Sequence, residues 1–194
     1  LVNRAFGKGF KQFDSFGNLK ERYNKFRSGK ETFLGVLKAF YRLFVLPRFA
    51  RQYPKEAGYV YFQEFMPENK FDIRVIVIGE KAFAIKRMVR ANDFRASGSG
   101  NILFDRDEID VECVKIAFDT NRKIGSQSVG YDFVFDINNK PLIVEISYGF
   151  GVAAYDPCPG YWDADLKWHP GSFNPQEWMV EELIKTVESN VKNG

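Results

Sequence analysis

The chain has 194 residues, of which 45% are hydrophobic and 16% aromatic, so it is long enough to bury a core in one or two domains. It contains no apolar run as long as a membrane-spanning helix and no pattern typical of a signal peptide. The net charge is +3, and one histidine with two separated cysteines argues against a zinc site, a disulfide framework and a Ser-His-Asp triad.

Residues 1–58 form a basic segment. Their 13 Lys/Arg and 4 Asp/Glu residues give a net charge of +9, whereas the rest of the chain carries −6. Within 1–28, aromatic residues lie among basic ones, and Gly7, Gly9 and Gly17 argue against a long helix. Such a mixture can indicate nucleic-acid binding. We instead expect loops whose aromatic side chains pack on a part of the molecule that this sequence does not include, and no nucleic-acid partner.

A helix is predicted over residues 30–46, where apolar side chains recur at helical spacing before Pro47. The apolar positions are Phe33, Val36, Leu37, Phe40, Leu43 and Phe44. A basic amphipathic helix of this kind can lie on an anionic membrane surface. It more often packs on its own protein, so membrane contact is not expected. Residues 47–58 are predicted to be a connector.

Strand patterns begin at residue 59. Three strands are predicted, at 59–65, 72–78 and 82–89, within a β subdomain that covers residues 59–104. A Ser- and Gly-rich loop at 96–101 would let backbone approach a phosphate.

Two further helices are predicted within residues 105–194. Asp105-x-x-Glu108 matches a capping box, and the helix that it opens is expected to end near Gly125. The last helix is expected to start at Asn174. Its apolar stripe is expected to face the core and consists of Met179, Val180, Leu183, Ile184 and Val187.

A β-hairpin is predicted over residues 128–151, with Asn138 and Asn139 as its loop. Asn tolerates the left-handed backbone that a tight hairpin loop needs. In this register Val134 pairs with Ile143, and a loop one residue longer would break the register.

The same register places two carboxylates, Asp132 and Glu145, directly opposite each other inside apolar strands. Ser147 lies two residues further on the same face, opposite Gly130. Opposed like charges destabilise a sheet, and a hard divalent cation such as Mg²⁺ would offset the repulsion. A solvated sheet face and a proton shared between the carboxylates are the alternatives.

These strands resemble the metal-binding end of ATP-grasp ligases, especially the RimK-type group that contains the ribosomal-protein glutamate ligase. That group has an Asp early in one strand and Glu-x-Asn at the end of the next. The corresponding residues are Asp132, Glu145 and Ser147, with Ser where the family usually has Asn. Further motifs match in the same order, namely Gln-Glu-Phe-Met at 63–66, Asp-Ile-Arg-Val at 72–75, Val-Ile-Gly at 77–79, Arg87 and Asn-Asp-Phe-Arg at 92–95.

The resemblance implies an α+β, ATP-grasp-like fold. We expect a small antiparallel sheet that covers ATP in residues 59–104. A larger antiparallel sheet with packed helices in 105–194 would hold the metal, together with the C-terminal helix. The family's N-terminal domain and its glycine-rich phosphate loop do not precede Leu1, so we expect a fragment of a longer protein that is inactive alone.

The resemblance also implies ATP and Mg²⁺ as cofactors. The adenine and ribose would be bound by Gln63, Glu64, Phe65, Met66 and Asp72. The backbone near Ser97 would approach a phosphate, although the family usually has Asn at this position.

Two arginines, Arg87 and Arg95, are the candidate catalytic residues, because a guanidinium can neutralise charge on a transferring phosphoryl group. Asp132, Glu145 and Ser147 would hold the metal. Arg74 shares a strand face with Asp72, and it either pairs with that carboxylate or contacts phosphate.

The implied reaction is ATP-dependent ligation of a small-molecule or peptide carboxylate to an amine or similar nucleophile, through an acyl-phosphate. The alternatives are a non-catalytic nucleotide- or ligand-binding scaffold and a kinase on the same fold. The aromatic segment after Ser147 either contacts the acceptor or caps the core, and its candidate residues are Tyr155, Asp156, Tyr161, Trp162 and His169. Reduced cysteines favour a cytoplasmic location. The oligomeric state is not fixed by the sequence.

Overall fold

The structure of the protein is a computed structural model that describes residues 2–11, 13–90, 96, 98 and 100–193. The chain divides into two compact units, Leu1–Glu64 and Phe65–Gly194, which we describe separately. No helix in the described ranges is long and apolar enough to cross a membrane.

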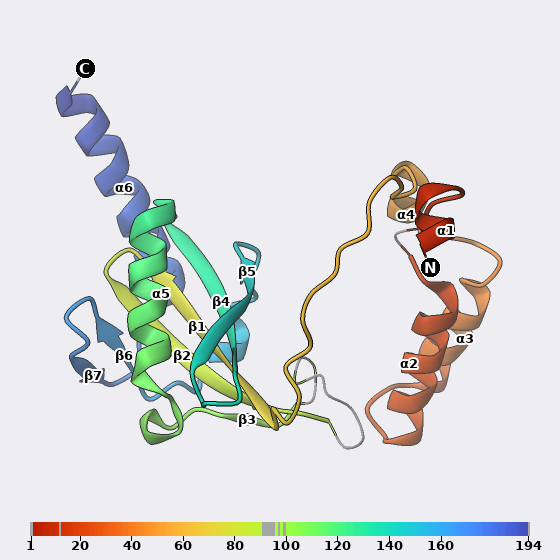
Figure 1. The fold of residues 1–194 in the computed structure, drawn as a ribbon, viewed down its shortest axis with the longest axis horizontal. Helices are drawn as coiled ribbons and strands as arrows, with labels where there is room; N and C mark the ends of the chain where they lie inside the picture. The colour runs from red at the N-terminus through yellow and green to blue at the C-terminus, as the bar shows by residue number, and fades with distance from the viewer. Residues whose placement is uncertain (1, 12, 91–95, 97, 99, 194) are drawn as a thin grey trace. The chain divides into compact units, whose positions relative to one another are not determined.

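The first unit is helical (Figure 1). Its elements are α1 (Val2–Phe6), α2 (Ser15–Arg27), α3 (Phe33–Tyr41) and α4 (Arg48–Gln52). The prediction of loops before residue 28 is wrong, because α2 begins at Asp14, whose carboxylate accepts a hydrogen bond from the Gly17 backbone N–H at 3.0 Å. α3 is shorter than the predicted helix and packs against α2, with Gly35 and Ala39 buried.

The strand predicted at 59–65 is not formed. The segment is rich in aromatic residues, which favour strands because their side chains pack against those of neighbouring strands. No described strand pairs with this segment, so that packing is missing. Tyr61 is 78% exposed and Phe62 is 81% exposed, which shows how little packs on them.

The second unit contains one antiparallel sheet of seven strands. These are β1 (Phe71–Ile78), β2 (Lys81–Met88), β3 (Ile102–Leu103), β4 (Ser128–Phe135), β5 (Pro141–Ser147), β6 (Gly160–Asp163) and β7 (Trp168–Pro170). The order is β5-β4-β1-β2-β6-β7, with β3 paired to β2. The predicted α+β, ATP-grasp-like class is confirmed. The strands expected in a small and a larger sheet belong to a single sheet, because β4 pairs with β1 along six residues.

Helix α5 (Val111–Ile124) covers one face of the sheet (Figure 1). Its buried side chains pack on the odd-numbered residues of β1, among them Val75, and on Tyr131 of β4. Gly125 ends the helix in the left-handed conformation, as predicted. The predicted capping box is wrong, since Asp110 is the N-cap and residues 106–108 form a separate 3-10 turn.

The opposite face is covered in part by the short 3-10 helix η2 (Ala153–Tyr155) and the start of α6 (Pro175–Asn193). Asn174 caps α6, as predicted, by accepting hydrogen bonds from the next backbone N–H groups. Trp178 is buried against Phe83. The later stripe is not core, since Val180, Leu183, Ile184 and Val187 are 51% to 55% exposed. The later part of the helix continues past the edge of the sheet (Figure 1).

Candidate nucleotide and metal site

The β4–β5 hairpin places Asp132 directly opposite Glu145 and Gly130 opposite Ser147, as predicted. The loop, however, has three residues, and Val134 pairs with Leu142 instead of Ile143. A β-bulge, where the register shifts between Asp132 and Phe133, restores the predicted pairing at Asp132. The carboxylates therefore meet across the strands despite the longer loop.

The predicted polar residues of four adjacent strands, β5, β4, β1 and β2, lie on the face of the sheet opposite α5. Pairing along β1 brings Asp72 beside Arg87 and Arg74 beside Asp132. Because side chains alternate along a strand, these four residues point away from the face that α5 covers. The same alternation places Glu145 and Ser147 of β5 on this face. We call this set of six residues the charged face.

Four of these residues form a continuous network of ion pairs. Arg74 donates to both oxygens of Asp132, from Nε to Oδ1 at 2.5 Å and from Nη2 to Oδ2 at 2.6 Å. Arg87 binds Asp72 in the same bidentate way, at 2.7 and 2.6 Å. It also donates to Oδ2 of Asp132 at 2.8 Å, and this bond joins the two pairs. Paired guanidinium and carboxylate groups of this geometry are among the strongest hydrogen-bonded contacts in proteins.

The network is largely buried. Asp132 is 5% exposed and Arg87 is 6% exposed. Burial raises the pKa of the Asp72 carboxyl, while the guanidinium of Arg87 opposes that rise. Burial alone would lower the pKa of Arg87, but the carboxylates of Asp72 and Asp132 outweigh it and the pKa is raised. Both arginines are therefore held as cations.

Tyr155 adjoins the network, since its hydroxyl group and the guanidinium of Arg74 shift each other's pKa. The Asp132 carboxylate is the main cause of the raised pKa of Arg74. Burial raises the pKa of Tyr155, and Arg74 opposes that rise. The predicted pairing of Arg74 with Asp72 is wrong, since its carboxylate partner is Asp132 on the neighbouring strand, while contact of Arg74 with phosphate stays a prediction.

Glu145 and Ser147 lie at the accessible edge of the charged face. Glu145 is exposed, and the absence of a side chain at Gly130 leaves room opposite Ser147, since a Cβ there would come within 2.9 Å of Ile76 and 3.4 Å of the Ser147 carbonyl oxygen. Oxygen ligands of this kind suit Mg²⁺, which takes one or two carboxylates and completes its shell with phosphate oxygens and water. Within the described ranges, no three His, Cys, Asp or Glu side chains cluster closely enough to hold a metal by themselves. The residues present thus fit a metal that arrives with a phosphate group.

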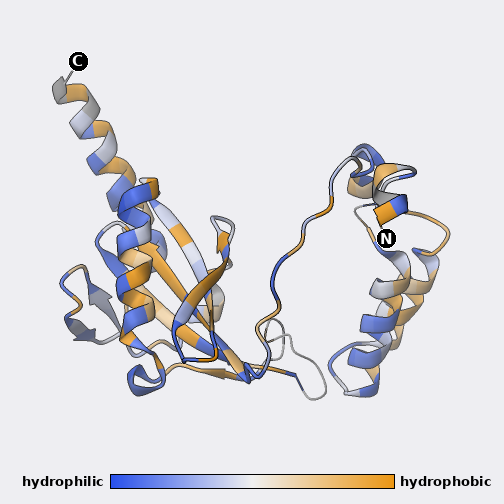
Figure 2. Ribbon diagram, viewed as in Figure 1, coloured by the Kyte–Doolittle hydropathy of each residue, from blue (hydrophilic) through white to orange (hydrophobic). Residues whose placement is uncertain are grey.

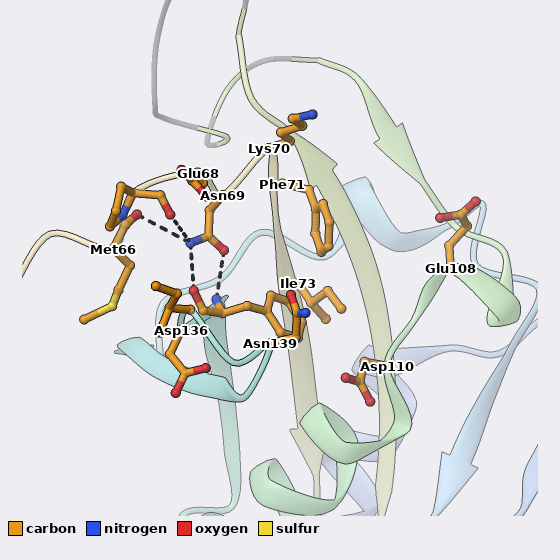
Figure 3. Close-up of a pocket in the computed structure, with 13 residues that line it drawn as sticks. Met66, Glu68, Asn69, Lys70, Phe71, Ile73, Glu108, Asp110, Asp136 and Asn139 are labelled. Carbon is orange, nitrogen blue, oxygen red and sulfur yellow. Dashed lines mark hydrogen bonds between the residues drawn. The ribbon is translucent and has the colours of Figure 1, made fainter.

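Asn69 is a site residue that sequence reasoning missed. Its side-chain amide accepts from the Phe135 backbone N–H at 2.8 Å and donates to the Phe135 carbonyl at 2.9 Å, as a paired strand residue would (Figure 3). It also donates to the carbonyl groups of Met66 and Pro67, at 3.4 and 3.3 Å. Asn69 therefore fixes the end of the predicted adenine-binding segment to β4, the strand that carries Asp132.

A cavity of about 480 Å³ adjoins this segment on the α5 side of the sheet. Met66, Phe71 and Ile73 contribute its apolar wall, while Glu108 and Asp110 lie on the other side (Figure 3). The cavity includes Met66 but none of the charged face.

The other predicted site residues are distributed as follows. Phe65 and Met66 begin the second unit, whereas Gln63 and Glu64 end the first. Arg95 and Ser97 lie outside the described residues.

Of the acceptor candidates, Tyr155 adjoins the charged face and Trp162 is buried in the core beneath α5. Tyr161 stacks on His169, with ring centroids 4.9 Å apart, and His169 Nε2 lies 2.6 Å from an Asp163 carboxylate oxygen. Tyr161 and His169 therefore contact each other on the β6–β7 hairpin.

A family model described as the RimK-like ATP-grasp domain matches residues 56–157. The match covers 102 of the 194 residues, which is more than half of the chain. It includes all six residues of the charged face, the segment at 63–66 and Asn69. Comparison with curated proteins gave no match.

Proposed function

The chain belongs to the RimK-like ATP-grasp family, and from this membership we propose that it carries the metal and phosphate site of an ATP-dependent carboxylate–amine ligase. Its substrates would be a small-molecule or peptide carboxylate and an amine or similar nucleophile, joined through an acyl-phosphate. Cys113 and Cys158 are free thiols, which supports a reducing, cytoplasmic location for the proposed reaction.

One observation carries this proposal, namely the convergence of two arginines, three acidic residues and a serine on one face of one sheet. When bound, ATP and Mg²⁺ would supply an activated phosphoryl group and neutralise part of its charge. Glu145 and Ser147 would hold the metal, with Asp132 as the second carboxylate. Positioning and charge neutralisation by fixed groups are what phosphoryl transfer requires of a protein.

The arginines have a distinct role in this proposal. Arg87 lies between the carboxylates of Asp72 and Asp132, so its position and charge are set before a nucleotide arrives. A cation fixed in advance needs no reorganisation when negative charge develops nearby. Arg74 holds Asp132 from the other side through a bidentate ion pair.

The test is calorimetric titration of the chain with a non-hydrolysable ATP analogue, with and without Mg²⁺. Glu145→Gln is the informative variant, because Glu145 is exposed and outside the network of ion pairs. We expect this variant to lose the Mg²⁺-dependent part of binding, while Glu188→Gln, at an exposed carboxylate on α6, leaves binding unchanged. Magnesium-dependent binding that survives in Glu145→Gln would refute the metal site.

The reaction class needs a second measurement, made on the longest available form of the protein with carboxylate and amine present. A ligase releases inorganic phosphate with ADP. A kinase on the same fold releases ADP alone, and a non-catalytic scaffold binds nucleotide without turnover. Either of the last two results would overturn the proposed ligation.

A further inference from the structure

Helix α3 has two apolar sides, and only one of them is covered by the first unit. Gly35 and Ala39 are buried where α3 packs on α2. Six large apolar side chains of α3 and the turn after it are exposed, by 47% to 76%. They are Phe33, Leu34, Leu37, Phe40, Tyr41 and Phe44, and we call them the exposed α3 face.

These six side chains form a single surface. At about 100° per residue, they fall within an arc of about 120° around the helix axis. Gly35 and Ala39 fall on the opposite side, and their small size lets α2 approach closely. α3 is coloured largely hydrophobic in Figure 2, in contrast to the adjacent α2. A contiguous exposed apolar patch of this kind marks an interaction site.

The part of the chain that carries this face is strongly positive. Residues 1–58 carry a net charge of +9. Their four acidic side chains have local partners: Asp14 caps α2, Glu21 pairs with Lys25, Glu31 pairs with Arg22, and Glu56 accepts from the Tyr59 hydroxyl. The acidic residues are thus occupied within the unit, and the excess charge presented to a partner is basic.

Basic residues also lie next to the exposed α3 face along the chain. Lys30 precedes the helix, Lys38 lies at the border of the apolar arc, and Arg48 and Arg51 belong to α4. All four are exposed. Long basic side chains can extend toward lipid phosphates while their aliphatic stems cover apolar surface.

Because this face is exposed and the unit is basic, we propose, contrary to the expectation from the sequence, that the exposed α3 face binds the surface of an anionic phospholipid bilayer, with the helix lying in the plane of the interface. The apolar arc would enter the boundary between headgroups and acyl chains, and the basic residues would contact lipid phosphates. The combination of a convex apolar face with excess positive charge favours a lipid surface over a protein partner, which would need a groove of complementary shape and acidic rim. A helix of nine residues lies on such a surface and does not cross it.

The test is flotation of the chain with vesicles of phosphatidylcholine alone and of phosphatidylcholine mixed with phosphatidylglycerol, without nucleotide. We expect binding to the mixed vesicles only, weakened by added salt. The double variant Leu34→Ser/Tyr41→Ser should weaken that binding by at least about tenfold, because it removes two apolar groups from the interface. The matched control is Ile137→Ser, at a side chain that is 96% exposed in the second unit and should not affect binding.

Charge and depth are tested separately. Lys38→Glu/Arg48→Glu should abolish the preference for phosphatidylglycerol, whereas Lys123→Glu on α5 should preserve it. Both native cysteines are buried, so an environment-sensitive dye can be attached selectively to Leu37→Cys. Its emission should shift to the blue only when anionic vesicles are added.

Two results would overturn the proposal. One is equal vesicle binding by the chain and by Leu34→Ser/Tyr41→Ser. The other is a failure of the chain to bind anionic vesicles. If the dye at position 37 then already reports an apolar environment before vesicles are added, protein covers this face instead. Neither result depends on the nucleotide site, so the ligase proposal would be unaffected.

Discussion

Asp132 and Glu145 lie directly opposite each other on β4 and β5, and two compensating irregularities of the hairpin bring them there. Asn139 adopts a left-handed conformation, with φ of 58°, in a three-residue loop that shifts the register by one position. The bulge at Val144 shifts it back before the carboxylates pair. Because a one-residue slip would turn Glu145 to the other face, the bulge decides whether the proposed metal ligands meet.

The two opposed carboxylates differ in what they contribute to stability. We expect Asp132→Asn to lower the free energy of unfolding by about 3 kcal/mol, because it breaks a buried ion pair and leaves Arg74 without its carboxylate. Glu145→Gln should change the free energy of unfolding by less than about 0.5 kcal/mol, since Glu145 is exposed. Urea denaturation of both variants measures the difference, and equal losses would contradict the geometry described.

Asn69 should affect both stability and nucleotide binding. Asn69→Ala leaves the Phe135 N–H and carbonyl groups without their partner, which we expect to cost about 1–3 kcal/mol of unfolding free energy. Asn69→Asp should be at least as damaging, because its carboxylate faces the carbonyl oxygens of Met66, Pro67 and Phe135.

Asn69→Ala also removes the hydrogen bonds that fix the end of the segment at 63–66 to β4. The segment should then be more mobile, and the affinity for the ATP analogue should fall. Calorimetry of Asn69→Ala beside Asn101→Ala, at an exposed asparagine, separates this effect from a general loss of polar contacts. Unchanged affinity in Asn69→Ala would show that this contact is structural only.

The protein should lose stability in alkaline solution. Burial raises the pKa of the Cys113 and Cys158 thiols from the ordinary 9.0 to about 12. A group whose pKa is higher in the folded state stabilises that state fully below the unfolded pKa, and the contribution is lost as the pH rises through the folded pKa. The free energy of unfolding should therefore fall between about pH 9 and pH 12, as measured by urea denaturation.

The cysteines can be separated from other groups in that range. Burial also raises the pKa of Tyr131 from 10.0 to about 12, so part of the fall should remain without the thiols. Cys113→Ala/Cys158→Ala should show a shallower pH dependence than the unchanged chain, even though its absolute stability is lower. Identical slopes would refute the contribution of the thiols.

The start of α5 offers a matched pair of aspartates. Asp110 accepts a hydrogen bond from the Glu112 backbone N–H at 2.9 Å, so Asp110→Ala should cost about 1 kcal/mol. Asp105 makes no such bond, and Asp105→Ala should cost less than about 0.5 kcal/mol. Asp110→Asn retains a capping oxygen and should stay close to the unchanged chain. Thermal unfolding of the three variants checks this order, and a larger effect at Asp105 would contradict it.

The features that the sequence predicted correctly depend on local chemistry. Gly125 ends α5 because glycine adopts the left-handed conformation, and Asn174 starts α6 because its side chain caps free N–H groups. The opposition of Asp132 and Glu145 was also predicted, although the loop was taken as two residues long. The three-residue loop shifts the strand register by one position, and the bulge shifts it back. The predicted pairing is therefore correct at Asp132, beyond the bulge, and wrong at Val134, between the loop and the bulge.

The features that could not be predicted depend on which segments become neighbours. Arg74 pairs with Asp132 because β4 lies beside β1, and no local pattern states that order. The strand predicted at 59–65 is not paired with any strand in the described part of the chain. Likewise, Val187 has the spacing of a core residue but is 54% exposed. Periodicity shows which side chains share a face, whereas burial depends on what packs there.

The pairing of Arg74 with Asp132 also has a consequence for biosynthesis. The two residues are 58 positions apart, so at typical rates of translation Asp132 is made roughly 3 to 12 s after Arg74. During that time the ribosome holds a chain whose β1 and β2 can already pair, with the guanidinium of Arg74 at the open edge that β4 will later occupy. The arrival of β4 brings Asp132 to Arg74, and Glu145 and Ser147 join the charged face only when β5 follows, so a nascent chain acquires its binding chemistry one strand at a time.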